Sequence, residues 1–129
     1  MVSRLGIVQI NVTDLARAKV FYVDTLGFKS GERFGPNEPF ELENRDGPTI
    51  LVYLVEKSVP SDYPHQTGAL LVFYTDDIER TVRDWKAKGV TFINIAWSRD
   101  ESGIADTPFG RFIAFRDPFG NVHELLEPR

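Results

Sequence analysis

The sequence predicts an α+β fold made of two half-length copies of one strand–helix–strands pattern. Three observations predict it: each half opens on an alternating strand, continues with a capped amphipathic helix, and ends in short β-branched and apolar runs. The chain has 129 residues, of which 42% are hydrophobic, so it can bury a core of its own. We expect a single domain with a first module at about residues 1–57, a linker at about 58–67 and a second module at about 68–129.

The first half opens on residues 7–12, where Val8, Ile10 and Val12 occupy every second position. Such alternation predicts a strand whose two faces meet different surroundings. Asp14 stands where a helix N-cap is expected, and an apolar stripe at helical spacing follows from residue 15 to residue 26. Gly27 suits the helix end, because that position favours a residue tolerant of positive φ.

The remainder of the first half is predicted to be turns and short strands. Residues 31–39 are rich in Gly, Pro and Asn and indicate a loop, whereas 40–43 indicate a short strand. Residues 46–48 read Asp-Gly-Pro and predict a turn, and 49–55 predict a longer strand. Residues 57–67 then form the connection between the halves.

The second half repeats the plan. Residues 70–75 predict a strand, and Asp76 and Asp77 supply a helix cap, with Asp76 and Glu79 as a capping box. The apolar stripe consists of Ile78, Val82 and Trp85, and Gly89 ends the helix.

Three more strands complete the second half. Residues 92–97 and 112–116 predict strands on either side of a polar loop at 98–108. Residues 117–120 read Asp-Pro-Phe-Gly, which fits a type I turn, and 121–126 predict the last strand. The stretch 100–108 is rich in Asp, Ser and Gly, and we interpret it as a lid over a cavity or as a disordered rim.

The two halves align in register. Asp14 lies over Asp77, Arg17 lies over Arg80, and Gly27 meets Gly89 after one gap. Two copies of about 60 residues are too long and too few for a solenoid, so we expect them to pair around a pseudo-twofold axis and to enclose a pocket.

Composition excludes several classes of function. There are no cysteines, which removes disulfides and thiolate chemistry and suits a reducing cytoplasm. The formal charge of -4 argues against nucleic acid as a partner. No long apolar run follows Arg4, as a secretory signal would require, and no segment approaches the roughly 20 apolar residues of a membrane span. We therefore expect a cytoplasmic protein without a membrane partner.

Two strings make the sequence more specific. One is Val-Thr-Asp-Leu at 12–15 with Phe-Tyr at 21–22 and Leu-Gly-Phe at 26–28, and the other is Asp-Pro-Phe-Gly-Asn at 117–121 with Glu-Leu at 124–125. Together they resemble the vicinal oxygen chelate superfamily, which includes glyoxalase I, the bleomycin and fosfomycin resistance proteins and the extradiol dioxygenases. The resemblance implies paired βαβββ modules whose strands curl into a mixed sheet around a central cavity, and a homodimer.

The same resemblance implies where a metal would be held, at two strand positions in each module. These positions fall on Ile7, on Leu51 or less favourably Tyr53, on Leu70 and on Glu124. Zinc, nickel, manganese and iron need about three N, O or S donors, and only Glu124 is the residue that the family's site expects. We therefore expect no metal and no other cofactor.

The two histidines do not supply the missing donors. His65 lies in the linker, and His123 is adjacent to Glu124 on a strand, so the two side chains should point to opposite faces.

Alternation identifies the residues expected to line a ligand cavity. They combine apolar side chains with a few polar points, a mixture typical of small-molecule sites. Gln9 and Asn11 have the alternative of ordinary solvent-facing polarity on a half-exposed strand. The full set is Ile7, Gln9, Asn11, Leu51, Tyr53, Leu70, Val72, Tyr74, Arg116 and Glu124.

Glu124 is the candidate for chemistry. Burial disfavours a carboxylate unless a cation or a hydrogen-bond donor compensates it, and Arg111 and Arg116 are the nearest cations in sequence. The side chain is interpreted as a general base, as a receptor for a cationic ligand, or as half of a structural pair.

Three functions follow from these alternatives. The first is a metal-free protein that binds a small hydrophobic or amphipathic molecule. The second is a metal-dependent lyase or dioxygenase with an altered metal site. The third is a metal-free enzyme in which Glu124 transfers a proton. The sequence favours the first and leaves open whether the protein is an enzyme.

Overall fold

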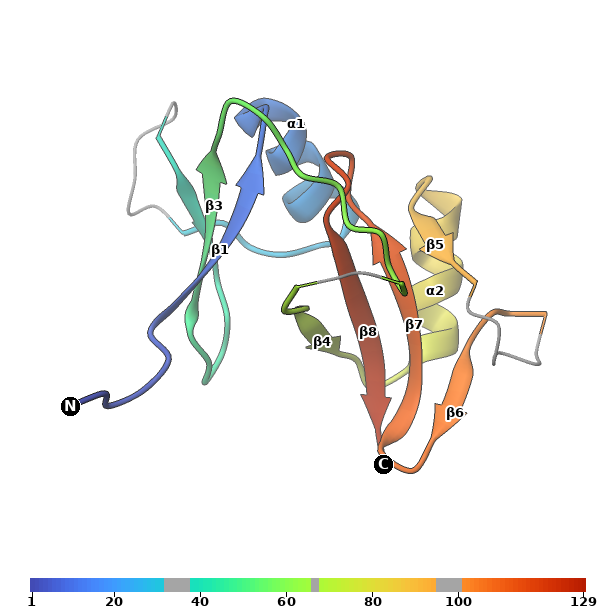
Figure 1. Cartoon of the computed structure of the whole chain (residues 1–129). Coiled ribbons are helices and arrows are strands. Elements are labelled where there is room, and N and C mark those ends of the chain that lie inside the picture. Colours follow the sequence, from blue (N-terminus) through green and yellow to red (C-terminus); the bar gives the residue numbers. More distant parts are fainter. Residues whose placement is uncertain (32–37, 66–67, 95–100) are drawn as a thin grey trace. The chain divides into compact units, whose positions relative to one another are not determined.

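The chain forms two compact units, residues 1–58 and 59–129, each with a helix and a sheet of its own. The computed structural model shown in Figure 1 describes residues 1–31, 38–65, 68–94 and 101–129. The predicted α+β fold class is confirmed. The centre of the predicted loop at 31–39, the end of the predicted strand at 92–97 and the start of the polar loop at 98–108 lie outside the described residues.

The sheet of the first unit contains β1 (Ile7–Val12), β2 (Phe40–Leu42) and β3 (Thr49–Leu54) in the order β1-β3-β2. β1 runs parallel to β3, and β2 runs antiparallel to β3. An isolated bridge between Ser30 and Leu42 extends the sheet beyond β2. The three strands predicted in this half are thus confirmed, with ends that differ by one residue at most.

The helix of the first unit begins as α1 (Leu15–Lys19) and continues as the π-helix η1 (Val20–Thr25). The Asp14 side chain accepts a hydrogen bond from the backbone N–H of Arg17 at 3.0 Å, which confirms the predicted N-cap. Gly27 follows the helix with φ of 90°. The change to wider π-turns was not predicted, because apolar spacing over six residues does not separate 3.6 residues per turn from a slightly larger number.

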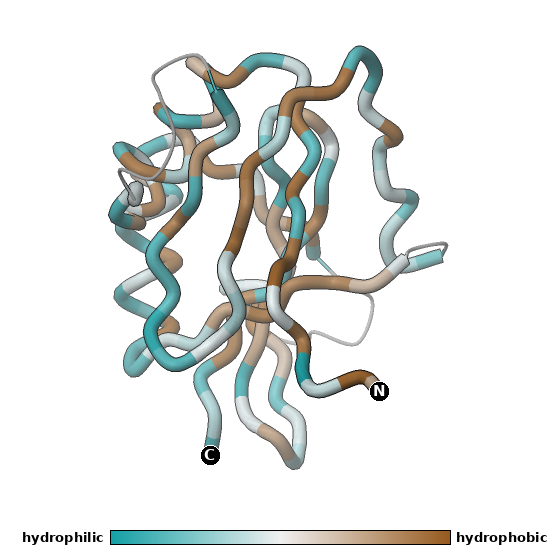
Figure 2. The backbone as a smooth tube through the Cα atoms, turned by 90° about the vertical axis from the view of Figure 1, so that its left-hand side faces the viewer, coloured by the Kyte–Doolittle hydropathy of each residue, from teal (hydrophilic) through white to brown (hydrophobic). Residues whose placement is uncertain are grey.

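Alternation along β1 and β3 divides the first sheet into a buried face and an exposed face. Ile10, Val12, Ile50 and Val52 are buried, whereas the residues between them on β1 are exposed. α1 contacts β3, so the helix covers the buried face. Figure 2 shows hydrophobic and hydrophilic residues alternating along β1, the strand that follows the N-terminal segment. The opposite, helix-free face is the one that the sequence assigns to a ligand.

The sheet of the second unit contains β4 (Val72–Tyr74), β5 (Thr91–Ile93), β6 (Ala105–Thr107), β7 (Gly110–Arg116) and β8 (Val122–Pro128). The order is β4-β8-β7-β5, and β6 also pairs with β7. β4 and β8 are parallel, and the other pairs are antiparallel. β4 is shorter than the strand predicted at 70–75.

The helix of the second unit, α2 (Ile78–Ala87), repeats the end devices of the first. The Asp77 side chain accepts a hydrogen bond from the backbone N–H of Arg80 at 3.1 Å. Gly89 follows the helix with φ of 89°. The predicted register of the repeat is therefore visible in the backbone itself.

The predicted capping box of Asp76 and Glu79 is wrong. The helix begins one residue later than that box requires, with Asp77 as its cap. Glu79 instead binds Arg111 at 2.7 Å, and the free N–H of Ile78 donates to Oε2 of Glu127 at 2.9 Å. A carboxylate from β8 thus satisfies the helix N-terminus that the box was expected to satisfy.

The stretch predicted as a lid or rim contains an ordered hairpin, β6 and β7, at residues 105–110. The Thr107 hydroxyl donates to the Gly110 carbonyl at 2.8 Å and accepts from the N–H of Gly110 at 3.2 Å. Gly110 has φ of 149°, and a side chain there would collide with the backbone of Glu127. The prediction of a loop or disordered rim is therefore wrong for 105–107, because ladder pairing and a tight turn fix this segment.

An aromatic cluster forms the core between α2 and its sheet. Phe115 is fully buried, and its ring lies 5.1 Å from the ring of Trp85, centroid to centroid. Phe73, Phe92 and His123 contact the same ring at 5.5 to 6.3 Å. Such contacts add to the free energy gained from burying the area.

None of the helices in the part of the chain that the structure describes combines the length and hydropathy that crossing a membrane requires.

Candidate functional site

The first-unit face is the helix-free side of the sheet β1-β3-β2. Ile7, Gln9 and Asn11 from β1 lie beside Thr49, Leu51 and Tyr53 from β3 in register. Ile7 is 59% exposed and Tyr53 42% exposed, which is high for large apolar or aromatic side chains. The sequence-predicted residues of this half therefore share one surface.

Two amides form a polar pair on the first-unit face. The Gln9 side-chain N–H donates to Oδ1 of Asn11 at 2.7 Å, and both residues are exposed. Because the Gln9 amide donates to Asn11, the hydrogen bond holds the two side chains in a fixed orientation on this face.

The second-unit face is the helix-free side of the other sheet. Val72 on β4 and Ala114 on β7 are the register partners of Glu124 on β8. Val72 is 45% exposed and Tyr74 is 75% exposed, whereas Glu124 is half-buried. This face thus combines exposed apolar and aromatic side chains with one carboxylate.

The connection after Ser58 belongs to the second unit and packs on this face. The phenol of Tyr63 donates a hydrogen bond to Oε2 of Glu124 at 3.0 Å. Tyr63 is only 9% exposed and lies in an apolar cluster. The other members of the cluster, with the hydrophobic side chains packed against it, are Ala105, Ala114, Val122, Leu70, Ile93 and Phe112.

Tyr63 keeps its proton at neutral pH. Burial raises the pKa of its phenol well above the ordinary value of 10, and the hydrogen bond to Glu124 and the charge of Glu124 raise it further. The phenol is therefore a permanent donor to the carboxylate. Sequence reasoning did not identify Tyr63, because 61 residues separate it from Glu124 and no motif joins them.

The two arginines considered as partners of Glu124 bind elsewhere. Arg116 lies on the second-unit face, and its Nη1 donates to the Ser61 carbonyl at 3.1 Å. Arg111 projects toward α2, where it pairs with Glu79 at 2.7 Å and approaches Glu127 at 3.9 Å. The sequence suggested an arginine as the partner of the Glu124 carboxylate, whereas the structure shows the phenol of Tyr63 in this role.

The Asp-Pro-Phe-Gly-Asn motif builds the turn before β8. Oδ1 of the buried Asp117 accepts from the backbone N–H groups of Phe119 and Asn121 at 2.9 and 2.8 Å. Oδ2 accepts from the side chain of Asn121 at 2.7 Å. The predicted turn is confirmed, and the Asp117 carboxylate accepts these three hydrogen bonds within it.

The same turn holds the connection in place. The Gly120 carbonyl accepts from the N–H of Ser61 at 3.0 Å, and Gly120 has φ of 86°. A Cβ at Gly120 would lie 2.8 Å from the Cβ of Pro60. Glycine is therefore required both by the backbone conformation and by the close approach of the connection.

The two histidines take no part in the second-unit face. His123 lies on the α2 side of β8, 2% exposed, with the rings of Phe73 and Phe115 at 5.5 Å. Burial lowers the pKa of His123 to about 4, and the charge of Asp117 opposes this only in part. His123 and Glu124 thus point to opposite faces, as alternation along the strand predicts. His65 is exposed in the connection.

The residues at the four ligand positions do not fit the metal that the resemblance implies. Ile7, Leu51 and Leu70 carry hydrocarbon side chains without a lone pair, and Glu124 already accepts a hydrogen bond from Tyr63. Across residues 1–31, 38–65, 68–94 and 101–129, no three His, Cys, Asp or Glu side chains gather closely enough to hold a metal ion.

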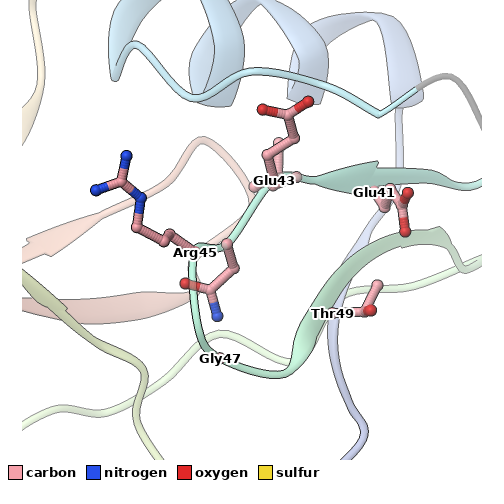
Figure 3. A pocket seen from close by; sticks show the side chains of 7 residues that line it. Glu41, Glu43, Arg45, Gly47 and Thr49 are labelled. Atoms are coloured by element: carbon pink, nitrogen blue, oxygen red, sulfur yellow. The ribbon is translucent and has the colours of Figure 1, made fainter.

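A separate hollow of about 310 Å³ lies at the turn between β2 and β3 in the first unit. Its side chains do not converge, because Glu43 and Arg45 point away from each other (Figure 3). None of the sequence-predicted site residues lines it. The lining consists of Glu41, Leu42, Glu43, Asn44, Arg45, Gly47 and Thr49.

The fold and the two motifs define the class of protein. A sequence model described as the Glyoxalase/Bleomycin resistance protein/Dioxygenase superfamily matches residues 4–125. The chain belongs to this superfamily.

Individual relatives match over almost the whole chain. An uncharacterized protein of Bacillus subtilis (strain 168), YetH, is 28% identical over 130 residues, covering 98% of this chain and 100% of the relative. A solved structure from Sphaerobacter thermophilus DSM 20745, described as a member of the same superfamily, is 26% identical with a TM-score of 0.66 and covers 98% of both chains.

Two further solved structures share the fold at lower identity. TnmS3, described as an antibiotic binding protein from Streptomyces sp. CB03234, is 24% identical with a TM-score of 0.69, covering 99% of this chain and 98% of that one. A putative glyoxalase family protein from Bacillus anthracis is 18% identical with a TM-score of 0.73, covering 100% of this chain and 98% of that one.

Proposed function

We propose that this protein binds a small amphipathic or hydrophobic molecule without a metal, on the helix-free faces of its sheets. One observation carries the proposal: large apolar and aromatic side chains are exposed at the positions that the sequence assigns to a ligand. They are Ile7 at 59%, Tyr53 at 42%, Val72 at 45% and Tyr74 at 75%.

Exposure of these side chains favours a ligand energetically. Each Å² of apolar surface that a ligand covers contributes about 25 cal/mol. The aromatic rings of Tyr53 and Tyr74 also offer flat surfaces on which planar or cyclic molecules can stack. The amides of Gln9 and Asn11 and the carboxylate of Glu124 are the sparse polar groups that orient a molecule in such a site.

The chemistry of the donor set supports binding without a metal. Three of the family's four ligand positions are hydrocarbon, and the fourth is hydrogen-bonded to a phenol. A divalent ion needs several donors around it to compete with water.

The neighbouring structures support binding as one use of this scaffold. TnmS3 is described as an antibiotic binding protein, and ChaP-H2, at 19% identity, is described as an oxidase. Because one fold carries both functions, the proposal for this chain rests on its own side chains.

We also propose that the protein is a homodimer, as the family resemblance implies, and that it is cytoplasmic, as its composition suggests. Light scattering on the purified protein should give twice the chain mass of 14.7 kDa. A mass of one chain at micromolar concentration would contradict the dimer and leave the ligand proposal intact.

The proposal is tested by mapping where a probe binds. In an amide NMR titration with 1-naphthalenemethanol, we expect shift changes on β1, β3 and β4 and none around Asn44 and Gly47 in the hollow. Tyr74→Ala should weaken binding about fivefold, since it removes one exposed ring from the site. Phe109→Ala is the matched control, because Phe109 is 80% exposed at the turn between β6 and β7 and is not one of the predicted ligand-site residues. Equal weakening by both substitutions, or shifts centred on the hollow, would contradict the proposal.

A further inference from the structure

Glu124 has one carboxylate oxygen in use and one available. Oε2 accepts the hydrogen bond from Tyr63 at 3.0 Å. Among the residues that the structure describes, none donates a hydrogen bond to Oε1, and Glu124 takes part in none of their ion pairs. The negative charge is therefore held in position but not neutralised.

The residues beside this carboxylate on the neighbouring strands and on β8 itself are hydrocarbon. Val72 and Ala114 flank it across the sheet, and Val122 precedes it on the same face of β8. Charges attract more strongly in such surroundings than in water, because the local dielectric constant is lower. A donor that reaches Oε1 is therefore bound more tightly here than at an ordinary surface carboxylate.

β4 lies beside the carboxylate, and its side chains on this face are exposed. Val72 pairs with Glu124 in register, and Tyr74 lies two residues further along the same strand. The 75% exposed ring of Tyr74 offers a face to an aromatic body or to a cation.

We propose that the Oε1 atom of Glu124 receives a protonated primary amine, so that the ligand is a small aromatic or apolar molecule with one ammonium group. This inference rests on the proposed function and deepens it by naming the polar group of the ligand. The apolar body lies on Val72 and Tyr74, and the ammonium group lies at Glu124.

The geometry selects one donor over two. A guanidinium group binds a carboxylate best through two parallel hydrogen bonds to both oxygens, and Tyr63 occupies one of them. An ammonium group is a compact point charge that one oxygen satisfies. Tyr63 acts in this proposal as a positioning residue, because its hydrogen bond holds Oε2 and leaves Oε1 for the ligand.

The inference is tested with three probes of one size: 1-naphthylmethylamine, 1-naphthalenemethanol and 1-methylnaphthalene. We expect the wild-type protein to bind the amine about tenfold more tightly than the hydrocarbon, as one charge-assisted hydrogen bond supplies. Glu124→Gln should reduce this preference to less than about threefold while leaving the affinity for the hydrocarbon unchanged. Glu43→Gln is the control, since it removes an exposed carboxylate from the first unit.

A second variant separates the carboxylate from the phenol. Tyr63→Phe leaves Glu124 charged, so it should keep the preference for the amine. Retention of the preference in Glu124→Gln, or its loss in Tyr63→Phe alone, would overturn the inference. Equal binding of amine and hydrocarbon by the wild-type protein would overturn it too and leave the proposed function standing. Failure of all three probes to bind would contradict the proposed function itself.

Discussion

The two units repeat the same backbone devices and differ in what lies on their helix-free faces. Asp14 and Asp77 cap the two helices through the N–H group three residues on, at 3.0 and 3.1 Å. Gly27 and Gly89 follow the helices with φ of 90° and 89°. In each unit the first strand runs parallel to a later one, β1 with β3 and β4 with β8.

The two units differ in the side chains on their helix-free faces. The first-unit face carries exposed Ile7 and Tyr53 and an amide pair. The second-unit face carries the connection, anchored through Tyr63 to Glu124 and through Ser61 to Gly120. The repeated sequence therefore determines the backbone arrangement of both units, whereas a segment that is not repeated determines the polar chemistry of one of them.

The largest expected effect concerns His123, a buried titratable group on β8 in the second unit. Its pKa of about 4 lies below the ordinary 6.5, so as pH falls the unfolded chain takes up a proton before the folded chain does. The free energy of unfolding should therefore keep its full value above pH 6.5 and fall by about 3 kcal/mol between pH 6.5 and 4.

Urea unfolding of His123→Phe over this pH range measures the contribution. In the variant, most of this fall in the free energy of unfolding should be absent, because phenylalanine does not titrate among the rings of Phe73 and Phe115. His65→Gln is the matched control and should follow the wild type. A decline of the same size in all three proteins would show that other groups cause it.

The next effect separates three glycines with positive φ. A Cβ at Gly27 or Gly89 would meet no atom within 4 Å, so alanine there pays only for backbone strain, about 1 kcal/mol. A Cβ at Gly120 would also press on Pro60, so Gly120→Ala should cost about 2–3 kcal/mol. Thermal or urea unfolding of the three variants checks this order. Equal costs would show that the connection does not pack on the turn.

The smallest effect tests the repeat itself. Asp14→Ala and Asp77→Ala should each lower the free energy of unfolding by about 1 kcal/mol, because each removes the acceptor of one N–H group at a helix start. Asparagine at either position should restore most of the loss, since it caps about as well as aspartate. A large difference between the two sites would break the equivalence of the caps.

Local features of the fold were predictable from the sequence, and long-range ones were not. Alternation along 7–12 gave the strand and its two faces, and Asp14 and Gly27 gave the helix ends, because each depends on residues within a few positions. β6 was missed because three residues of a polar segment carry no period. The capping box failed because Asp76 and Asp77 both fit a cap and only tertiary contacts, such as Glu127 on Ile78, decide the register.

The candidate site shows the same division. Alternation placed Ile7, Gln9 and Asn11 on one surface, and His123 opposite Glu124. Tyr63 was not predictable, since its hydrogen bond to Glu124 spans 61 residues of chain. The family motif at 117–121 holds a turn through Asp117, so its presence gives the fold and does not require a metal at Glu124.

Binding of a small molecule to the helix-free faces without a metal is tested most directly by calorimetry. We would titrate 1-naphthalenemethanol into the protein, first with EDTA and then with added zinc, nickel, manganese or iron. We predict the same affinity for the probe in every case. Binding or turnover that appears only after a metal is added would contradict the claim.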